Sequence, residues 1–418
     1  MRMTFCIFVL LILSSCQSTD TRQKNSEFVW IDSWASSHLS TTVTKFAPET
    51  QATVPTQFND QTLRLVIWNQ LAGEKVRIKF SNIFAKEPLH IQAAHLALPD
   101  VQPGSILPES DRQLMFSGQP SLTLAPGEEV WSDALDFSVA ALTNLVVSLY
   151  LPQTFTPTQF HPTALKTNFI FNTKGDQTSA QRLDPLATKT SMLFFISDLQ
   201  VDIKTKSPKN SPKLLVALGD SITDGAVSDV DTETNWPSSL AKRIARDLKP
   251  NSISVINMGI GSNRFCASDG AGPSGLNRLQ KDVLARPHLQ WVILLEGIND
   301  ISYENISAGN LIKCYKNAIA QLRAKNIKVY QSPLLPIKHS VKDTVENEAT
   351  RKAANQWIRN TQPKDGGPDA VIDFESAVWD PDDHLQILPK LTSDYVHPNS
   401  AGYILMAEAI DLSLFTNK

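Results

Sequence analysis

The sequence lacks three features that would each point to a particular class of protein. Lysine and arginine total 39 against 42 aspartates and glutamates, so a net charge of −3 gives no electrostatic sign of nucleic-acid binding. No His-Glu-x-x-His pair and no cluster of cysteines or histidines at ligand spacing occurs, and we predict neither a metal nor another cofactor. The apolar run at residues 5–13 is too short to span a bilayer. What is left is a globular chain of 418 residues, long enough for two or three domains.

Cysteine is also scarce, and two of the four cysteines lie in the N-terminal segment. There a positively charged residue precedes the short apolar run, as in a signal peptide. The run ends in Leu-Ser-Ser-Cys at residues 13–16, which resembles the lipobox of bacterial lipoproteins, whose cysteine is lipidated. We therefore expect residues 1–16 to be a lipoprotein signal peptide with Cys16 as the lipidation site, followed by a polar tether at residues 17–27. An ordinary secretory signal is the alternative.

The residue after the cysteine bears on where such a lipoprotein is sorted. It is Gln17 rather than aspartate, which resembles lipoproteins that are sent on to an outer membrane. The prediction is therefore an exported protein held at the cell envelope by a lipid anchor, in the periplasm or at the cell surface.

The first half of the mature chain, residues 28–204, shows hydrophobic alternation with a period of two. Turn-rich stretches such as Leu-Pro-Asp at 98–100 and Ala-Pro-Gly at 125–127 separate the alternating runs. This pattern predicts an antiparallel β-sandwich domain. The polar, proline-punctuated residues 205–213 are then a linker. The alternating positions are Leu63, Leu65, Ile67, Val76, Ile78, Phe80, Leu145, Val147, Leu149 and Leu151.

In the second half, residues 214–418, short apolar strands alternate with helical stretches. This alternation predicts an α/β domain with a five-stranded, parallel, doubly wound sheet that is covered on both faces. The expected strands are residues 214–218, 254–258, 291–295, 328–332 and 370–374, and the clearest helices are residues 236–248, 311–325, 346–360 and 400–412.

Four motifs follow the first three strands or precede the last helix, so all four are expected at the carboxyl edge of the sheet, where ligands bind in such folds. In chain order they are Gly-Asp-Ser-Ile-Thr-Asp-Gly at 219–225, Gly-Ile-Gly-Ser-Asn-Arg at 259–264, Gly-Ile-Asn-Asp at 297–300 and Asp-Tyr-Val-His-Pro at 394–398. Together they resemble the four sequence blocks of the SGNH (GDSL-type) hydrolase superfamily. The upstream half is similar to the β-rich domain that precedes the hydrolase domain in one bacterial branch of that superfamily.

The resemblance implies a catalytic triad of Ser221, His397 and Asp394. A serine hydroxyl is a weak nucleophile until a base takes its proton, and His397 fits that base. Asp394, three residues before it, would hold the imidazole tautomer and stabilise the imidazolium. A cap of the local turn is the alternative role for Asp394.

The same resemblance implies an oxyanion hole built from three groups. These are the backbone amide of Ser221, an amide of the second block and the side-chain amide of Asn299, each worth roughly 3 kcal/mol. The family's second block ends Gly-Ile-Ser-Gly-Asn, whereas here Ser262 takes the place of the last glycine. Either Gly261 or Ser262 then supplies the amide, and a simple turn-forming role is the alternative for Asn299.

The mature body retains two cysteines, Cys266 and Cys314. An exported protein meets an oxidising compartment, and in the expected fold the two lie on adjacent strand–helix units, so we predict a disulfide between them. Two separate buried cysteines are the alternative.

The sequence therefore predicts an exported serine esterase that acts through an acyl-enzyme intermediate. We expect short acyl esters, especially acetyl esters of carbohydrates, as substrates, so that the partners are a small-molecule or glycan ester and the membrane that holds the anchor. A lysophospholipase or thioesterase is the alternative among enzymes. A catalytically inactive, carbohydrate-binding lipoprotein is the alternative of another class.

Overall fold

The computed structural model of the chain describes residues 27–41, 54–205, 211–267 and 272–416. The predicted signal peptide, the lipidation site Cys16 and the tether up to residue 26 lie outside the described residues. Within the described ranges, no helix has the length and apolarity needed to cross a bilayer.

Antiparallel sheets make up the N-terminal half. One sheet has the order β1-β15-β4-β10, with β9 also paired to β4, and the other has the order β14-β13-β3-β11-β6-β7. Apolar side chains from both sheets form one buried cluster, which includes Ile31, Ile78, Leu65 and Val147. The strands are β1 (Glu27–Ala35), β3 (Gln61–Asn69), β4 (Gly73–Ser81), β6 (Ala93–Ala97), β7 (Arg112–Gln113), β9 (Glu129–Trp131), β10 (Leu135–Val139), β11 (Thr143–Leu151), β13 (Asn168–Ile170), β14 (Thr188–Thr190) and β15 (Ile196–Thr205).

Two short antiparallel pairs complete this half. They are β2 (Leu39–Ser40) with β12 (Gln159–Phe160), and β5 (Leu89–Ile91) with β8 (Leu122–Leu124).

A five-stranded parallel sheet forms the centre of the C-terminal half, in the order β17-β16-β18-β19-β20. Its strands are almost wholly buried, as expected for a sheet covered on both faces. The strands are β16 (Lys213–Gly219), β17 (Ile253–Gly259), β18 (Leu289–Leu295), β19 (Lys328–Gln331) and β20 (Ala370–Val371). The predicted antiparallel sheets and the predicted parallel sheet are both confirmed.

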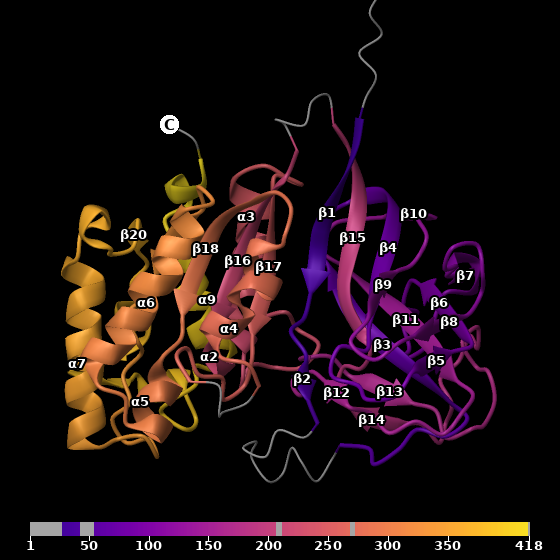
Figure 1. The fold of residues 1–418 in the computed structure, drawn as a ribbon, viewed down its shortest axis with the longest axis horizontal. Helices are drawn as coiled ribbons and strands as arrows, with labels where there is room; N and C mark the ends of the chain where they lie inside the picture. The colour runs from indigo at the N-terminus through magenta and orange to yellow at the C-terminus, as the bar shows by residue number, and fades with distance from the viewer. Residues whose placement is uncertain (1–26, 42–53, 206–210, 268–271, 417–418) are drawn as a thin grey trace, which may run out of the picture.

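The helices of this half fall into two packed groups. In one group α3 packs against α9 and α9 against α8, and in the other α6 packs against α7, α5 against α7 and α4 against α6 (Figure 1). The longer helices are α3 (Trp236–Asp247), α6 (Ala308–Arg323), α7 (Val345–Asn360) and α9 (Ser400–Glu408), and the shorter ones are α2 (Ser221–Asp224), α4 (Gly275–Leu279), α5 (Ile298–Glu304) and α8 (Phe374–Val378).

Several predicted boundaries differ from the structure, including the start of α6, which lies at Ala308 instead of residue 311. The last strand ends at Val371 instead of residue 374, because Asp373 caps α8 by accepting a hydrogen bond from the Ser376 amide. The last helix ends at Glu408 instead of residue 412, and a separate 3-10 turn, capped by the Asp411 side chain, follows at Leu412–Phe415. The linker is also shorter than predicted, because β15 extends to Thr205 and β16 begins at Lys213.

The two halves lie side by side, with β1 against β17 at their boundary (Figure 1). Ala35 and Trp68 of the N-terminal half belong to the apolar core of the C-terminal half. The side-chain amide of Gln70 donates to the Val255 carbonyl at 2.6 Å and accepts from the Val255 amide at 2.9 Å. Since β17 is an edge strand, Gln70 satisfies backbone groups that a further strand would otherwise pair with.

Candidate active site

Ser221 lies directly after β16, at the first turn of the short helix α2. The Asp220 carboxylate caps this helix by accepting from the Ile222 amide at 3.0 Å, and Gly225 ends it at a φ of 108°. Helix α2 packs so closely on β17 that a Cβ on Gly259 would meet the Asp224 amide at 2.1 Å. The turn leaves Ser221 partly exposed at the carboxyl edge of the sheet, while the residues that follow it are buried.

His397 and Asp394, which the sequence suggested as partners of Ser221, lie beside it. The Ser221 Oγ is 2.7 Å from Nε2 of His397, and Nδ1 of the same ring is 2.7 Å from Oδ2 of Asp394. The other oxygen of Asp394 accepts from the backbone amides of Val396 and His397 at 2.9 and 2.8 Å. Burial raises the pKa of Asp394, but these hydrogen bonds and the charge of His397 outweigh it and lower the pKa. The carboxylate therefore remains ionised and can orient the imidazole.

The second and third blocks are joined to each other by hydrogen bonds. The Nδ2 of Asn299, at the start of α5, donates to the Asn263 carbonyl at 2.9 Å. Asp300 accepts from the backbone amides of Phe265 and Cys266 at 2.7 and 2.8 Å. Asn299 and Asp300 are both buried, so this pair of loops is a fixed unit beside the serine.

Ser262 stands where the family has a glycine, and its backbone adopts a conformation that glycine favours. Its φ is +60°, in the left-handed region that favours glycine, and the Asn263 amide closes the turn by donating to the Ile260 carbonyl at 3.1 Å. The loop thus keeps the tight turn of the second block with a serine in place of glycine.

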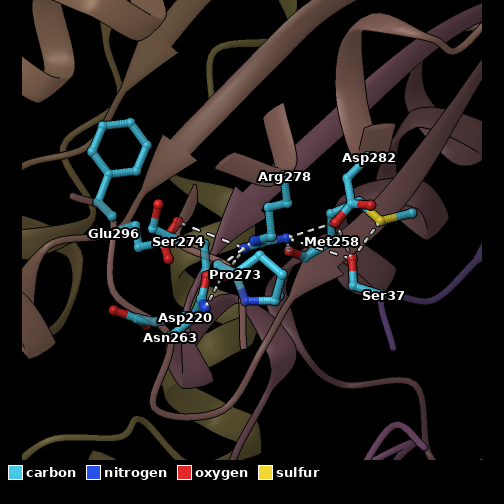
Figure 2. A network of polar contacts seen from close by, with 12 residues as sticks. Ser37, Asp220, Met258, Asn263, Pro273, Ser274, Arg278, Asp282 and Glu296 are labelled. Atoms are coloured by element: carbon cyan, nitrogen blue, oxygen red, sulfur yellow. Dashed lines mark hydrogen bonds and ion pairs between the residues drawn. The ribbon is translucent and has the colours of Figure 1, made fainter. Parts of the chain in front are cut away.

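A buried arginine, Arg278, connects these blocks through hydrogen bonds and an ion pair (Figure 2). Its Nη2 donates to the Gly219 carbonyl at 2.9 Å, and its Nε donates to Asn263 Oδ1 at 2.9 Å. The same Nη2 lies 3.6 Å from Glu296, the residue before the third block. Arg278 therefore touches the residues that immediately precede or form three of the four blocks.

Two carboxyl groups near this arginine have raised pKa values. Burial raises the pKa of Glu296 to about 8, and the charge of Arg278 offsets only part of that effect. Burial also raises the pKa of Asp220 to about 6, in spite of the hydrogen bond from Ile222. Asp220 and Asp300 hold the loops in place, since their hydrogen bonds are to backbone amides.

The N-terminal half also contacts this region. Ser37 Oγ donates to Asp282 Oδ2 at 2.7 Å and lies 3.5 Å from Nη1 of Arg278, as Figure 2 shows. His161, which belongs to the N-terminal half, is buried, with Nε2 3.0 Å from Oδ1 of Asp224. Nothing in the local sequence around His161 distinguishes it, because its partner is 63 residues away.

A second residue that the sequence did not indicate is Lys342. Its ammonium group donates to Oδ1 of Asn299 at 2.9 Å and lies 4.2 Å from the centre of the Tyr303 ring. Arg264, the last residue of the second block, is buried and pairs with Glu304 at 2.8 Å.

The two cysteines of the C-terminal half are joined. Cys266, just past the second block, forms a disulfide with Cys314 on α6, with Cα atoms 5.8 Å apart. The bridge ties the loop after the second block to the helix that follows the third.

Comparisons with known proteins agree with the architecture of the C-terminal half. Residues 217–405 match the GDSL-like lipase/acylhydrolase family. No curated protein matches the chain.

Three solved structures similar to this half are a proposed lipolytic protein of the G-D-S-L family from Desulfitobacterium hafniense, an acetyl xylan esterase, and a carbohydrate acetylesterase family member from Sinorhizobium meliloti. They are 25%, 21% and 16% identical, with TM-scores of 0.38, 0.37 and 0.38. The matches cover 47%, 47% and 49% of this chain and 97%, 96% and 96% of those chains. The C-terminal half of this protein thus matches the GDSL-like lipase/acylhydrolase family over residues 217–405, and a region of antiparallel β-sheets precedes it.

Proposed function

We propose that the protein is a serine esterase that hydrolyses carboxylic esters through an acyl-enzyme intermediate. The observation that carries this proposal is the chain of contacts from Ser221 Oγ to His397 Nε2 and from His397 Nδ1 to Asp394, each 2.7 Å long. This is the geometry that a nucleophile, its base and the orienting acid require.

In the proposed reaction His397 Nε2 takes the proton of Ser221 as Oγ attacks the ester carbonyl carbon. Asp394 stabilises the imidazolium that forms. When the tetrahedral intermediate collapses, the bond to the alcohol oxygen breaks and His397 returns the proton to that alcohol. Water then attacks the acyl-enzyme with the same base, releasing the acid and restoring the Ser221 hydroxyl.

The negative charge on the tetrahedral intermediate needs donors that are already aimed at it. We assign this role to the amide of Ser221, an amide of Gly261 or Ser262, and the Nδ2 of Asn299. The fixed position of Asn299, whose amide bonds both Asn263 and Lys342, supports its part in this set.

For the substrate, we favour short acyl esters, and acetyl esters of carbohydrates among them. The two groups that hydrogen-bond to the Asn299 side chain are polar or charged, and polar surroundings suit a small acyl group with a hydroxylated alcohol better than a long alkyl chain. They are the backbone carbonyl of Asn263 and the ammonium group of Lys342.

One observation favours the second candidate, a lysophospholipase or thioesterase. Val341 and Val345 flank the lysine that contacts Asn299, and they are 95% and 83% exposed. Exposed apolar side chains beside a site can receive an acyl chain. The inactive, carbohydrate-binding alternative has less support, because the serine, the histidine and the aspartate are all present and in contact.

We also propose that the protein is exported and lipid-anchored at the cell envelope through Cys16. The support is the apolar N-terminal run that ends in the lipobox-like Leu-Ser-Ser-Cys.

The test uses nitrophenyl esters of increasing acyl length beside acetylated oligosaccharides, with the purified wild type and Ser221→Ala. We expect the variant to lose activity by a factor of at least about 10⁴ while keeping its circular dichroism spectrum and melting temperature. Turnover of the variant within a few fold of the wild type would remove Ser221 from the mechanism. A preference for long acyl chains would favour the second candidate function, a lysophospholipase or thioesterase.

A further inference from the structure

Lys342 is a lysine whose charge is buried beside the proposed oxyanion hole. The residue is only 7% exposed, and it lies between β19 and α7, outside the four sequence blocks. Among the described residues, its ammonium group makes one hydrogen bond, to Oδ1 of Asn299 at 2.9 Å, and it also faces the ring of Tyr303. The loop that carries Lys342 is held in place, because the Asn347 side chain and the Thr344 amide both donate to the Lys342 carbonyl.

Burying the Lys342 ammonium group costs free energy, which suggests that its charge has a functional role. Removing an ammonium group from water costs several kcal/mol, and an apolar side chain at the same place would avoid that cost. Burial is the main reason that the pKa of Lys342 falls to about 8; the charge of Arg264 lowers it further, while Asp220 and Asp394 raise it. The lysine is thus charged at neutral pH and close to losing its charge.

The contact determines which way the Asn299 amide points. A lysine ammonium can donate hydrogen bonds but cannot accept one, so it can lie only against the oxygen of the amide. The nitrogen of Asn299 must then point away from Lys342, and one of its two hydrogens is bonded to the Asn263 carbonyl. The second hydrogen remains for an acceptor on the substrate. A cation on the amide oxygen also polarises the amide and strengthens its N–H groups as donors.

We propose that Lys342 is a positioning residue for the oxyanion hole, holding the Asn299 amide in the donor orientation and reinforcing it with a positive charge. This inference rests on the proposed function, in which Asn299 stabilises the oxyanion. Lys342 does not touch the reacting atoms; it acts through Asn299, and its effect belongs to the transition state, where the oxyanion carries its charge.

The first test measures kcat and KM for nitrophenyl acetate with Lys342→Met, which keeps the length of the side chain and removes its donor and charge. We expect kcat to fall about 10- to 100-fold with little change in KM, the effect of losing one hydrogen bond to a charged group. Lys342→Gln keeps a donor without the charge and should recover part of the loss. Lys338→Met is the matched control, since Lys338 lies on the same loop but pairs with Asp383, and its kcat should not change.

A double variant shows whether the effect passes through Asn299. If Lys342 acts on the amide, Lys342→Met should change kcat less than twofold in the Asn299→Ala background. Additive losses would overturn the proposal, as would a folded Lys342→Met or Lys342→Gln protein with kcat within twofold of the wild type. A different result would contradict the proposed function, namely that Ser221→Ala retains activity.

The pH profile separates positioning by a charge from a merely structural role. The wild-type kcat should fall as the pH rises through about 8, where Lys342 loses its charge, and this fall should be absent in Lys342→Met. Asp220 and Asp394 are already ionised there. Glu296, whose pKa burial raises to about 8, titrates in the same window, so Glu296→Gln must keep the fall. If the fall persists in Lys342→Met, the charge has no role in the oxyanion hole.

Discussion

The imidazole of His161 lies against the carboxylate of Asp224, with Nε2 and Oδ1 3.0 Å apart and both side chains almost fully buried. His161 belongs to the antiparallel half of the chain and Asp224 to the turn that carries Ser221. Nδ1 of the same ring is 2.8 Å from the Ser37 carbonyl, so the ring contacts the N-terminal half on one side and the turn that carries Ser221 on the other. The β-sheet half therefore directly supports the turn that we propose to carry the nucleophile.

Replacing His161 with alanine should weaken both the fold and the reaction. The variant leaves Asp224 buried without its partner, and breaking such a pair costs roughly 3 to 5 kcal/mol of unfolding free energy. We expect a lower melting temperature and a lower kcat, partly restored in His161→Gln, which keeps a donor. His90→Ala is the control, because His90 contacts only Thr123 and Gln92 among the described residues.

The stability lost in His161→Ala should depend on pH in a defined direction. Burial lowers the pKa of His161, but the charge and hydrogen bond of Asp224 and the Ser37 carbonyl raise it overall. The stabilisation by the charged pair is therefore complete below the pKa of an unfolded histidine and is lost as the pH rises through the higher folded value. The stability difference between wild type and His161→Ala should be larger at pH 6 than at pH 9. An equal difference at both would contradict a charged His161.

Asn299→Ala separates the catalytic role of Asn299 from a turn-forming role. An oxyanion donor acts mainly in the transition state, so kcat should fall by roughly two to three orders of magnitude while KM changes little. Steady-state kinetics together with thermal unfolding distinguish the two roles. Near-normal kcat with a clearly reduced melting temperature would leave the oxyanion hole to the backbone amides.

Glu296 should make the protein less stable as the pH rises. Because burial raises its pKa from 4.5 to about 8, the charged form is unfavourable in the folded state. The stabilisation by the protonated carboxyl is complete below the unfolded pKa and is lost as the pH rises towards about 8, by an amount on the order of 5 kcal/mol. Urea unfolding at pH 5 and pH 9 should show this loss in the wild type and in the exposed control Glu109→Gln. A Glu296→Gln protein with the same loss would show that another group is responsible.

The proposed membrane anchor depends on Cys16. Cys16→Ser should release the protein from the membrane fraction or leave the precursor unprocessed, because the acylated cysteine is the anchor. Fractionation and gel mobility of the expressed protein measure both outcomes. A variant that behaves like the wild type in both would indicate a signal of another kind.

The parts of the molecule that the sequence predicted are those set by local patterns. Period-two alternation identified strands such as β3 and β11, and the apolar runs before the motifs identified β16, β17 and β18 to within two residues. Asp394 and His397 are three residues apart, so their contact follows from one turn of chain.

What the sequence did not predict depends on contacts between distant segments. Arg278, Lys342 and His161 lie in no recognisable motif, and each becomes significant only when the fold brings it to a block 59, 43 or 63 residues away. The length of strand β20 was overestimated because a local pattern does not reveal that Asp373 caps the start of a helix.

The pairing of β1 with β15 has a consequence for the order in which the protein is made. β15 ends at Thr205 and pairs with both β1 and β4, so the first sheet can close only when the ribosome has passed that point. Every strand of the parallel sheet is synthesised later. Domains fold largely as units, the N-terminal one first. The antiparallel half can thus be complete before the C-terminal half folds, and the C-terminal half then folds against a surface that already presents Trp68, Gln70 and His161.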